Sequence, residues 1–294
     1  EVAALAKLTV LRPGLVMADT SYGGTSLLRG LASLPFATPV VGQGDQVFNP
    51  IHATDLARVV AQCLTKPPGV GPWDIGGPPR ITQSALLDRL RAWYGLPTVP
   101  VLRIPVPVAR VAGRIGDALR MEPISRTAVA QIEQGVETDA APLLAHLPTQ
   151  PRGVDVFLAN RPAGTQDLWH ARLFLIRPLI RLTLAVLWIV SGLLGLLLPP
   201  ERFLPLIETA VLSDGVAVLL ARAGGVADLL IAGALLRNWR PRLIGLTQLA
   251  RVGGYTVAFT AIAPGLWALP LGGLLKNLPI LVLIATWMVL EDQR

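Results

Sequence analysis

Two patterns of hydrophobic and polar residues divide the chain near its middle. Before about residue 147, short apolar runs alternate with segments whose apolar residues recur at helical spacing. The runs that predict short strands are Leu8–Leu11, Val40–Val41, Val47–Ile51 and Trp73–Ile75. The predicted helices cover 25–34, 54–64 and 82–94, with Thr54 and Thr82 as caps for the last two. Alternating strands and helices are typical of an α/β domain.

The second half of the chain is much more continuously apolar. Four long segments follow one another, at about 173–198, 216–236, 243–263 and 271–290. Each is long enough for a helix that crosses the hydrocarbon core, and they leave no polar face for water. The last is the weakest, because its span includes Lys276 and Asn277. A re-entrant segment remains the alternative there, and a soluble helical core is the alternative for the whole region.

Composition and charge favour the membrane interpretation. Hydrophobic residues make up 52% of the chain and charged residues 15%, with a net charge of +7. Three arginines lie between 172 and 181 and three between 237 and 242, whereas the loop 199–215 has three acidic residues and one arginine. This distribution predicts a multi-pass protein with both termini cytoplasmic. Since the arginines flank apolar runs, the lipid bilayer is the expected partner, and nucleic acid is not.

Three charged residues fall inside the predicted spans: Arg222, Asp228 and Arg251. Charges at such positions are costly and indicate functional sites by default. Asp228 and Arg251 each lie eight residues from the same end of adjacent antiparallel helices, which puts both at a depth of about 12 Å. We predict an ion pair between them, with a water-filled cleft as the alternative. Arg222 lies nearer the outer face, where it can snorkel.

The residues give no signal for a metal site or a disulfide. Cys63 is the single cysteine, so it cannot form an internal disulfide, and burial as a small apolar side chain is the expectation. The three histidines are far apart in the sequence and match no metal-binding spacing. No metal is therefore predicted.

Three stretches of the first half resemble a known family of enzymes. They are TVLRPGLVMA (9–18), PVVGQGDQVFNPIHATDLARVVAQCL (39–64) and WDIGGPPRITQSALLDRL (73–90). In this order and spacing they resemble the C-terminal half of extended or atypical short-chain dehydrogenase/reductases, closest to the NAD(P)-binding, complex-I-subunit-like group. The resemblance covers roughly 1–147. It implies a partial α/β Rossmann-type module. With the four apolar segments, the expected fold class is this module followed by an all-α four-helix transmembrane bundle.

The resemblance also implies roles for particular residues. The segment expected beside the nicotinamide of NAD or NADP is Pro13, Gly14, Leu15 and Val16. The substrate side is expected along the loop from Ala18 to Tyr22. The His-x-x-Asp pattern of the family matches His52 and Asp55, and we expect these two to fix a strand-to-helix turn rather than to carry out chemistry.

The sequence departs from this family in two ways. No Gly-rich turn follows a strand near the N-terminus, although the family seats the pyrophosphate on such a turn. The family's Tyr-x-x-x-Lys is also absent, because Tyr22, Tyr94 and Tyr255 lack a lysine four residues on. We therefore expect the chain to lack its dinucleotide-binding half and to be inactive as given, and we predict no catalytic residue. Whether the half was lost or never present stays open.

A second resemblance covers about 155–294. The stretches QDLWHARL (166–173) and LKNLP (275–279) resemble the DoxX-like domain that is fused to such dehydrogenases in bacteria. It implies a bacterial inner-membrane location and, because the wider family includes redox members, a quinone or other membrane redox partner. Trp169 is expected to anchor the chain at the membrane interface. The predicted domains are 1–147, a hinge and interfacial entry at 148–170, and 171–294.

Two functions follow from these observations. The first is a membrane-anchored, NAD(P)-dependent oxidoreductase of the short-chain dehydrogenase type, with the cofactor held only by the full-length protein. The alternative is a non-enzymatic integral membrane protein whose degenerate α/β module serves in assembly or interaction. A transporter or channel is a third and weaker hypothesis, because it rests on the three intramembrane charges alone.

Overall fold

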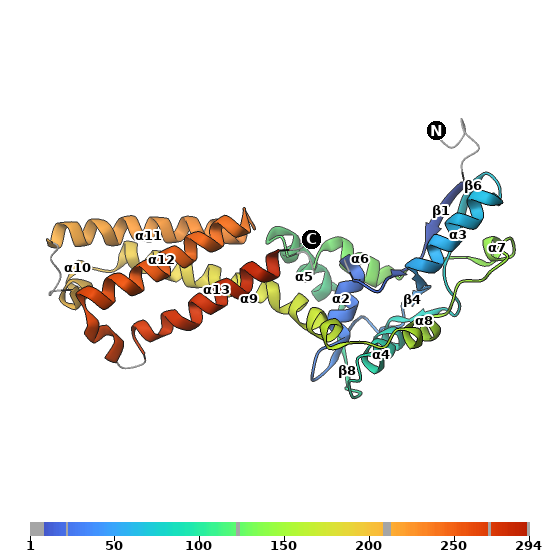
Figure 1. The fold of residues 1–294 in the computed structure, drawn as a ribbon, viewed down its shortest axis with the longest axis horizontal. Helices are drawn as coiled ribbons and strands as arrows, with labels where there is room; N and C mark the ends of the chain where they lie inside the picture. The colour runs from blue at the N-terminus through green and yellow to red at the C-terminus, as the bar shows by residue number, and fades with distance from the viewer. Residues whose placement is uncertain (1–8, 22, 122–123, 208–212, 270–271, 293–294) are drawn as a thin grey trace. The chain divides into compact units, whose positions relative to one another are not determined.

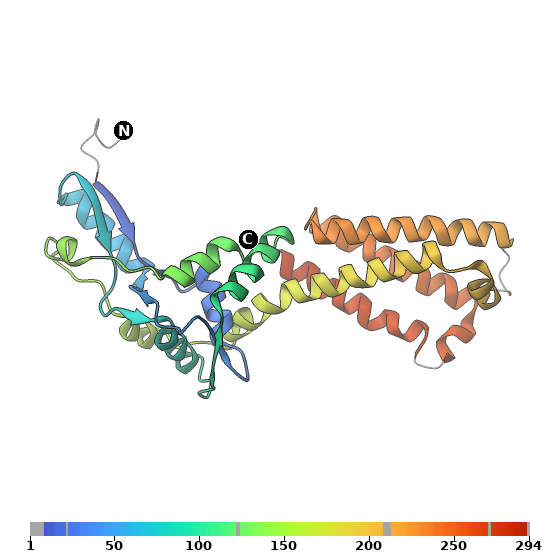
Figure 2. The same cartoon turned by 180° about the vertical axis from the view of Figure 1, so that it is seen from behind.

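The computed structural model describes residues 9–21, 23–121, 124–207, 213–269 and 272–292. The chain forms two compact units, Glu1–Leu175 and Ile176–Arg294. The first contains short strands and helices, and the second is helical (Figures 1 and 2). The predicted order, an α/β module followed by a region of apolar helices, is thereby confirmed.

The strands of the α/β unit are short and pair two by two. They are β1 (Thr9–Pro13), β2 (Val16–Met17), β3 (Thr38–Val41), β4 (Val47–Phe48), β5 (Ile51–His52), β6 (Gly71–Ile75), β7 (Ile81–Thr82) and β8 (Val101–Ile104). The pairs β1–β6, β2–β5 and β3–β8 are parallel, and β4–β7 is antiparallel. Parallel partners need long connections, and helices supply them here, so the unit is α/β in its connectivity.

Helices occupy the segments that the sequence predicted, and others besides. They are α2 (Gly23–Ala32), α3 (Ala53–Thr65), α4 (Gln83–Trp93), α5 (Val106–Ala118), α6 (Arg126–Gln134), α7 (Ala141–Leu144) and α8 (Val154–Asn160). Thr82 caps α4 as predicted, because its hydroxyl accepts a hydrogen bond from the Ala85 amide at 3.3 Å. The cap of α3 is His52 rather than Thr54: the imidazole Nδ1 accepts from the Thr54 amide.

The core of this unit lies around α4. Leu86, Leu87 and Leu90 of that helix are completely buried, and the apolar side of α8 packs into the same cluster through Phe157 and Leu158. The segment that the sequence assigned to a hinge therefore contains a helix that is part of the core.

Among its described residues, the second unit contains four long helices and several short helical turns. Its elements are α9 (Thr165–Leu197, which begins in the first unit), α10 (Pro200–Phe203), η1 (Leu204–Ile207), α11 (Asp214–Leu236), α12 (Pro241–Ile262), η2 (Pro264–Ala268), η3 (Leu274–Lys276) and α13 (Asn277–Glu291). Among the described residues, three helical segments are long and apolar enough to cross a membrane: α9, α11 and Leu274–Glu291. Helix α12 stands where a span was predicted, but it is more polar, so its crossing stays a prediction.

The helical unit is apolar both inside and outside. Trp188 of α9, Leu235 of α11 and Trp287 of α13 are buried in its centre. Large aliphatic side chains also cover its outer surface, among them Leu230, Val257 and Val289. A helix that is apolar all round belongs in a membrane or a large core, and a lipid environment matches this exposed surface.

Small residues bring two of these helices into backbone contact. A Cβ atom at Gly192 of α9 would lie 2.8 Å from the carbonyl oxygen of Gly225 in α11. A Cβ atom at Gly225 would lie 2.7 Å from the carbonyl oxygen of Gly192. Real Cβ contacts are not this short, so larger residues would push the helices apart. Close packing of this kind supplies much of the association energy of helices in lipid.

Candidate functional site

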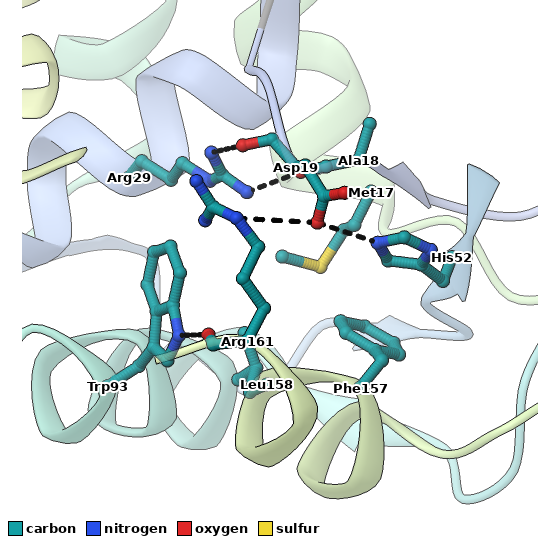
Figure 3. A pocket seen from close by; sticks show the side chains of 9 residues that line it. All are labelled: Met17, Ala18, Asp19, Arg29, His52, Trp93, Phe157, Leu158 and Arg161. Carbon is teal, nitrogen blue, oxygen red and sulfur yellow. Dashed lines mark hydrogen bonds and ion pairs between the residues drawn. The ribbon is translucent and has the colours of Figure 1, made fainter. Parts of the chain in front are cut away.

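A pocket in the α/β unit gathers charged and aromatic side chains from five elements (Figure 3). Its lining residues are Met17 of β2, Ala18 and Asp19 just after it, Arg29 of α2, His52 of β5, Trp93 of α4, Phe157 and Leu158 of α8, and Arg161. Parallel pairing of β2 with β5 places the C-terminal ends of both strands at the same edge. This explains why Asp19 and His52, which are far apart in sequence, meet there.

Asp19 forms the acidic centre of the pocket. Its Oδ1 atom lies 3.5 Å from Nε2 of His52 and 3.5 Å from Nε of Arg161. Because Nδ1 of His52 accepts the Thr54 amide hydrogen, the neutral imidazole carries its proton on Nε2, which then faces the carboxylate. Figure 3 shows the Asp19 carboxylate between the two partners. The arrangement is a histidine–carboxylate pair in which the Asp19 carboxylate is exposed to solvent and the imidazole is buried.

Two arginines contact the same tryptophan. The side chain of Arg29 is buried and donates to the carbonyl oxygens of Ala18 and Asp19 at 2.7 and 3.4 Å. Its guanidinium carbon lies 5.3 Å from the Trp93 ring centroid, and that of Arg161 lies 5.7 Å away. Burial lowers the pKa of Arg29 from its usual range. Arginine remains charged in proteins, so two cations and Asp19 define the electrostatics of this pocket.

The pocket is small. Its cavity volume is about 10 Å³, which is room for roughly one water molecule. Pockets for organic ligands usually enclose about 300–1,000 Å³. The residues present therefore do not fit a dinucleotide by themselves in this conformation. No cluster of three potential metal ligands occurs among the residues that the structure describes.

The residues predicted beside the nicotinamide lie next to this pocket in sequence but are not among its lining residues. Gly14 donates its amide to the Ile75 carbonyl at 2.8 Å, and a Cβ there would lie 2.5 Å from the Asn49 carbonyl oxygen. Leu15 accepts from the Ile51 amide at 2.9 Å, Val16 belongs to β2, and Pro13 ends β1.

Ala18 and Tyr22 bound the loop that was predicted to face the substrate. Ala18 lines the pocket, at the start of the loop that also carries Asp19. Tyr22 lies outside the described residues. The loop that the resemblance indicated thus contributes to the pocket through its first two positions.

Asp55 has the structural contacts that were expected of it. Its carboxylate is 1% exposed and accepts from Arg152 Nε at 2.9 and 3.1 Å, with a further ion pair to Arg58. Together with the His52 cap, these contacts fix the β5–α3 turn and tie it to the chain 97 residues later.

A second polar cluster lies inside the helical unit. Arg251 Nε donates to Asp228 Oδ1, which is the ion pair that equal depth predicted. Ser191 of α9 donates its hydroxyl to the other carboxylate oxygen at 2.7 Å. Arg251 also donates to the Gly224 carbonyl at 2.6 Å, and its guanidinium lies 4.9 Å from the Tyr255 ring. The cluster connects α9, α11 and α12.

Arg222 has a specific partner rather than a free position at the interface. It donates to the carbonyl oxygens of Gly195 and Leu198, at 2.9 Å each. The last carbonyls of a helix have no partner within it, and an unpaired carbonyl is costly in lipid. Arg222 therefore satisfies the C-terminal end of α9 from the neighbouring helix.

Sequence reasoning missed two further polar contacts between helices. Trp188 of α9 donates its indole N–H to Gln248 of α12 at 2.8 Å, and both side chains are buried. Asn277 of α13 donates to the Thr256 hydroxyl of α12 at 2.8 Å. These polar residues explain why α12 is less apolar than its neighbours. The sequence of one apolar segment does not indicate which residue of another helix its polar side chain will contact. The two hydrogen bonds are therefore seen only once the helices are packed.

The fold and these two sites define a class of protein: a membrane protein with a helical, lipid-exposed domain and an α/β unit on the same chain. Comparison with known proteins agrees for the helical part. Residues 185–285 match the family model described as the DoxX-like family. No curated protein sequence matches the chain.

The α/β part has partial likenesses among solved structures. One is dTDP-glucose 4,6-dehydratase from Bacillus anthracis in complex with NAD, at 18% identity and a TM-score of 0.29, covering 33% of this chain and 32% of that one. Another is UDP-glucose 4-epimerase from Thermotoga maritima with UDP-glucose, at 23% identity and a TM-score of 0.28, covering 34% and 33%. The chain spans about a third of the length of these structures. Likenesses this partial establish no activity.

Proposed function

We propose that this chain provides the substrate side and the membrane anchor of a membrane-bound, NAD(P)-dependent oxidoreductase of the short-chain dehydrogenase type. The observation that carries the proposal is the pocket around Asp19. Two of its lining residues, Ala18 and Asp19, stand on the loop that the family resemblance assigned to the substrate, and a histidine, two arginines and an aromatic ring line the same pocket. Convergent polar groups and an ionisable pair are usual at such sites.

In this proposal the cofactor binds only when the dinucleotide-binding half is present. The side chains of this chain then have defined tasks: Asp19 and His52 hold or move a proton at the substrate, and Arg29 and Arg161 fix its orientation. The helical domain keeps the reaction at the bilayer, where a quinone or another membrane redox partner is accessible. The location proposed is the bacterial inner membrane with both termini cytoplasmic.

The second candidate is a non-enzymatic membrane protein whose α/β unit serves in assembly. The small cavity favours it, because it has room for about one water and not for an organic substrate. The charges also neutralise one another: Asp19 pairs with His52 and Arg161, and Arg161 bonds Asp167 at 3.0 Å. Ion pairs of this kind serve structure as well as chemistry.

Dinucleotide binding separates the two candidates. The protein is purified in nanodiscs and titrated with NADH and NADPH by fluorescence, and their oxidation is followed with aldehydes, ketones and quinones. The proposal predicts binding and turnover, with turnover lost in Asp19→Asn and binding retained. Asp155→Asn is the matched control, because Asp155 is 60% exposed like Asp19 and also pairs with an arginine. Absence of dinucleotide binding would refute the oxidoreductase and leave the assembly role.

A further inference from the structure

Helix α5 carries an apolar stripe that faces solvent. Its packed side consists of small residues, Ala109, Gly113 and Gly116. On the opposite side Val108, Val111 and Ile115 are 55%, 51% and 52% exposed. Their spacing of three and four residues puts the three side chains on one face of the helix. Single exposed aliphatic residues are ordinary, but a continuous stripe on one helix marks an interaction surface.

Arginines outnumber acidic residues in the sequence around this stripe. From Val101 to Pro123 there are four arginines and two acidic residues. Arg110 and Arg114 follow the stripe along the helix, and Arg103 and Arg120 stand before and after it. Arg110 also holds Glu133 of α6 in an ion pair, which lowers the pKa of that carboxyl and fixes the helix on its neighbour.

An apolar stripe with basic residues at its edge is the pattern of helices that lie in the membrane interface. The aliphatic side chains enter the boundary between headgroups and acyl chains, and the arginines contact anionic headgroups. The same chain carries a membrane domain, so a lipid surface is always available to the α/β unit at high local concentration. A protein partner would instead need to supply acidic groups around an apolar groove, whereas anionic lipid offers both chemistries in one surface.

We propose that α5 is an interfacial helix: it docks the α/β unit on the anionic lipid surface through Val108, Val111 and Ile115, with Arg103, Arg114 and Arg120 on the headgroups. The unit is then held at the bilayer at a second point besides its covalent connection. This fixes which face of the unit meets the lipid, independently of any catalytic activity.

Site-specific fluorescence in nanodiscs tests this docking. In a Cys63→Ser background, Val111→Cys is labelled with an environment-sensitive dye. Val60→Cys is the matched control, because Val60 is also an exposed valine in a helix of the same unit, α3. The nanodiscs contain phosphatidylcholine alone or with phosphatidylglycerol, and nitroxide-bearing lipids serve as quenchers.

The expected result is severalfold stronger lipid quenching at position 111 than at position 60, with a blue-shifted emission, in the anionic nanodiscs. Replacing Arg103, Arg114 and Arg120 by glutamine, or adding salt, should reduce the quenching toward the value in phosphatidylcholine alone. Equal quenching at positions 111 and 60 would overturn the proposal. A blue shift at 111 that persists in detergent without lipid quenching would also overturn it, since a second copy of the chain would then cover the stripe.

Discussion

Breaking the ion pair between Asp228 and Arg251 should destabilise the helical unit far more than breaking an exposed pair. The Asp228 side chain is 5% exposed and that of Arg251 is 19% exposed. Arg251→Met leaves the carboxylate with the Ser191 hydroxyl alone. Removing one partner of a buried pair costs about 3–5 kcal/mol, because a charge remains without compensation. We expect a loss of this size in the free energy of unfolding.

The same chain supplies an exposed pair as a control. Arg242 and Asp292 lie 2.8 Å apart, with side chains that are 77% and 46% exposed. Arg242→Gln should therefore change the free energy of unfolding by about 0–1 kcal/mol. Both variants are measured by titrating the purified protein in mixed micelles with sodium dodecyl sulfate and following helicity by circular dichroism.

Double variants separate the loss of the pair from the loss of packing. Asp228→Asn combined with Arg251→Met removes both charges, and should recover most of the stability lost by Arg251→Met alone. Exchanging the two charges should recover it as well. If Arg251→Met proves as mild as Arg242→Gln, the pair contributes nothing to the bundle and the reasoning from burial is wrong.

Four further predictions concern packing and titration. Gly192→Leu should lower the melting temperature of the helical unit, because of the contact with α11, whereas Gly253→Leu should not, because no atom of the described residues lies within 4 Å of the place a Cβ would take there. Asp55→Asn should cost the α/β unit about 3 kcal/mol in chemical denaturation, since two arginines lose their carboxylate. Burial raises the pKa of Cys63, so maleimide should label it more slowly than free cysteine at neutral pH until denaturant is added. Burial raises the pKa of Tyr94 to about 12 from 10.0, so ultraviolet titration should find its phenol neutral above pH 10. The contribution of the neutral phenol to the free energy of unfolding is complete below pH 10 and is lost as the pH rises toward 12.

Local signals in the sequence predicted the four long helices and the first three helices of the α/β unit. The Thr82 cap and the apolar spacing after it located α4, and the long apolar runs located the long helices of the second unit. Counting residues along two antiparallel helices was enough to pair Asp228 with Arg251. Each of these inferences uses a single helix or two neighbouring ones, where the geometry is regular.

Contacts between distant segments were not predictable in this way. The pocket combines Asp19, Arg29 and Arg161, which no motif connects. Helix α8 is seven residues long, too short for its apolar spacing to indicate a helix, so its segment was assigned to a hinge. The sequence predicts Thr54 as the cap of α3, because hydroxyl side chains are the commoner caps. The structure has His52 there, since the fold sets the orientation of its imidazole.

The helical unit is expected to reside in the lipid bilayer. Extraction of cell membranes with alkaline carbonate, after expression of this chain, measures this integration. The chain should stay in the membrane pellet and dissolve only with detergent. Recovery of folded chain in the aqueous supernatant without detergent would contradict it.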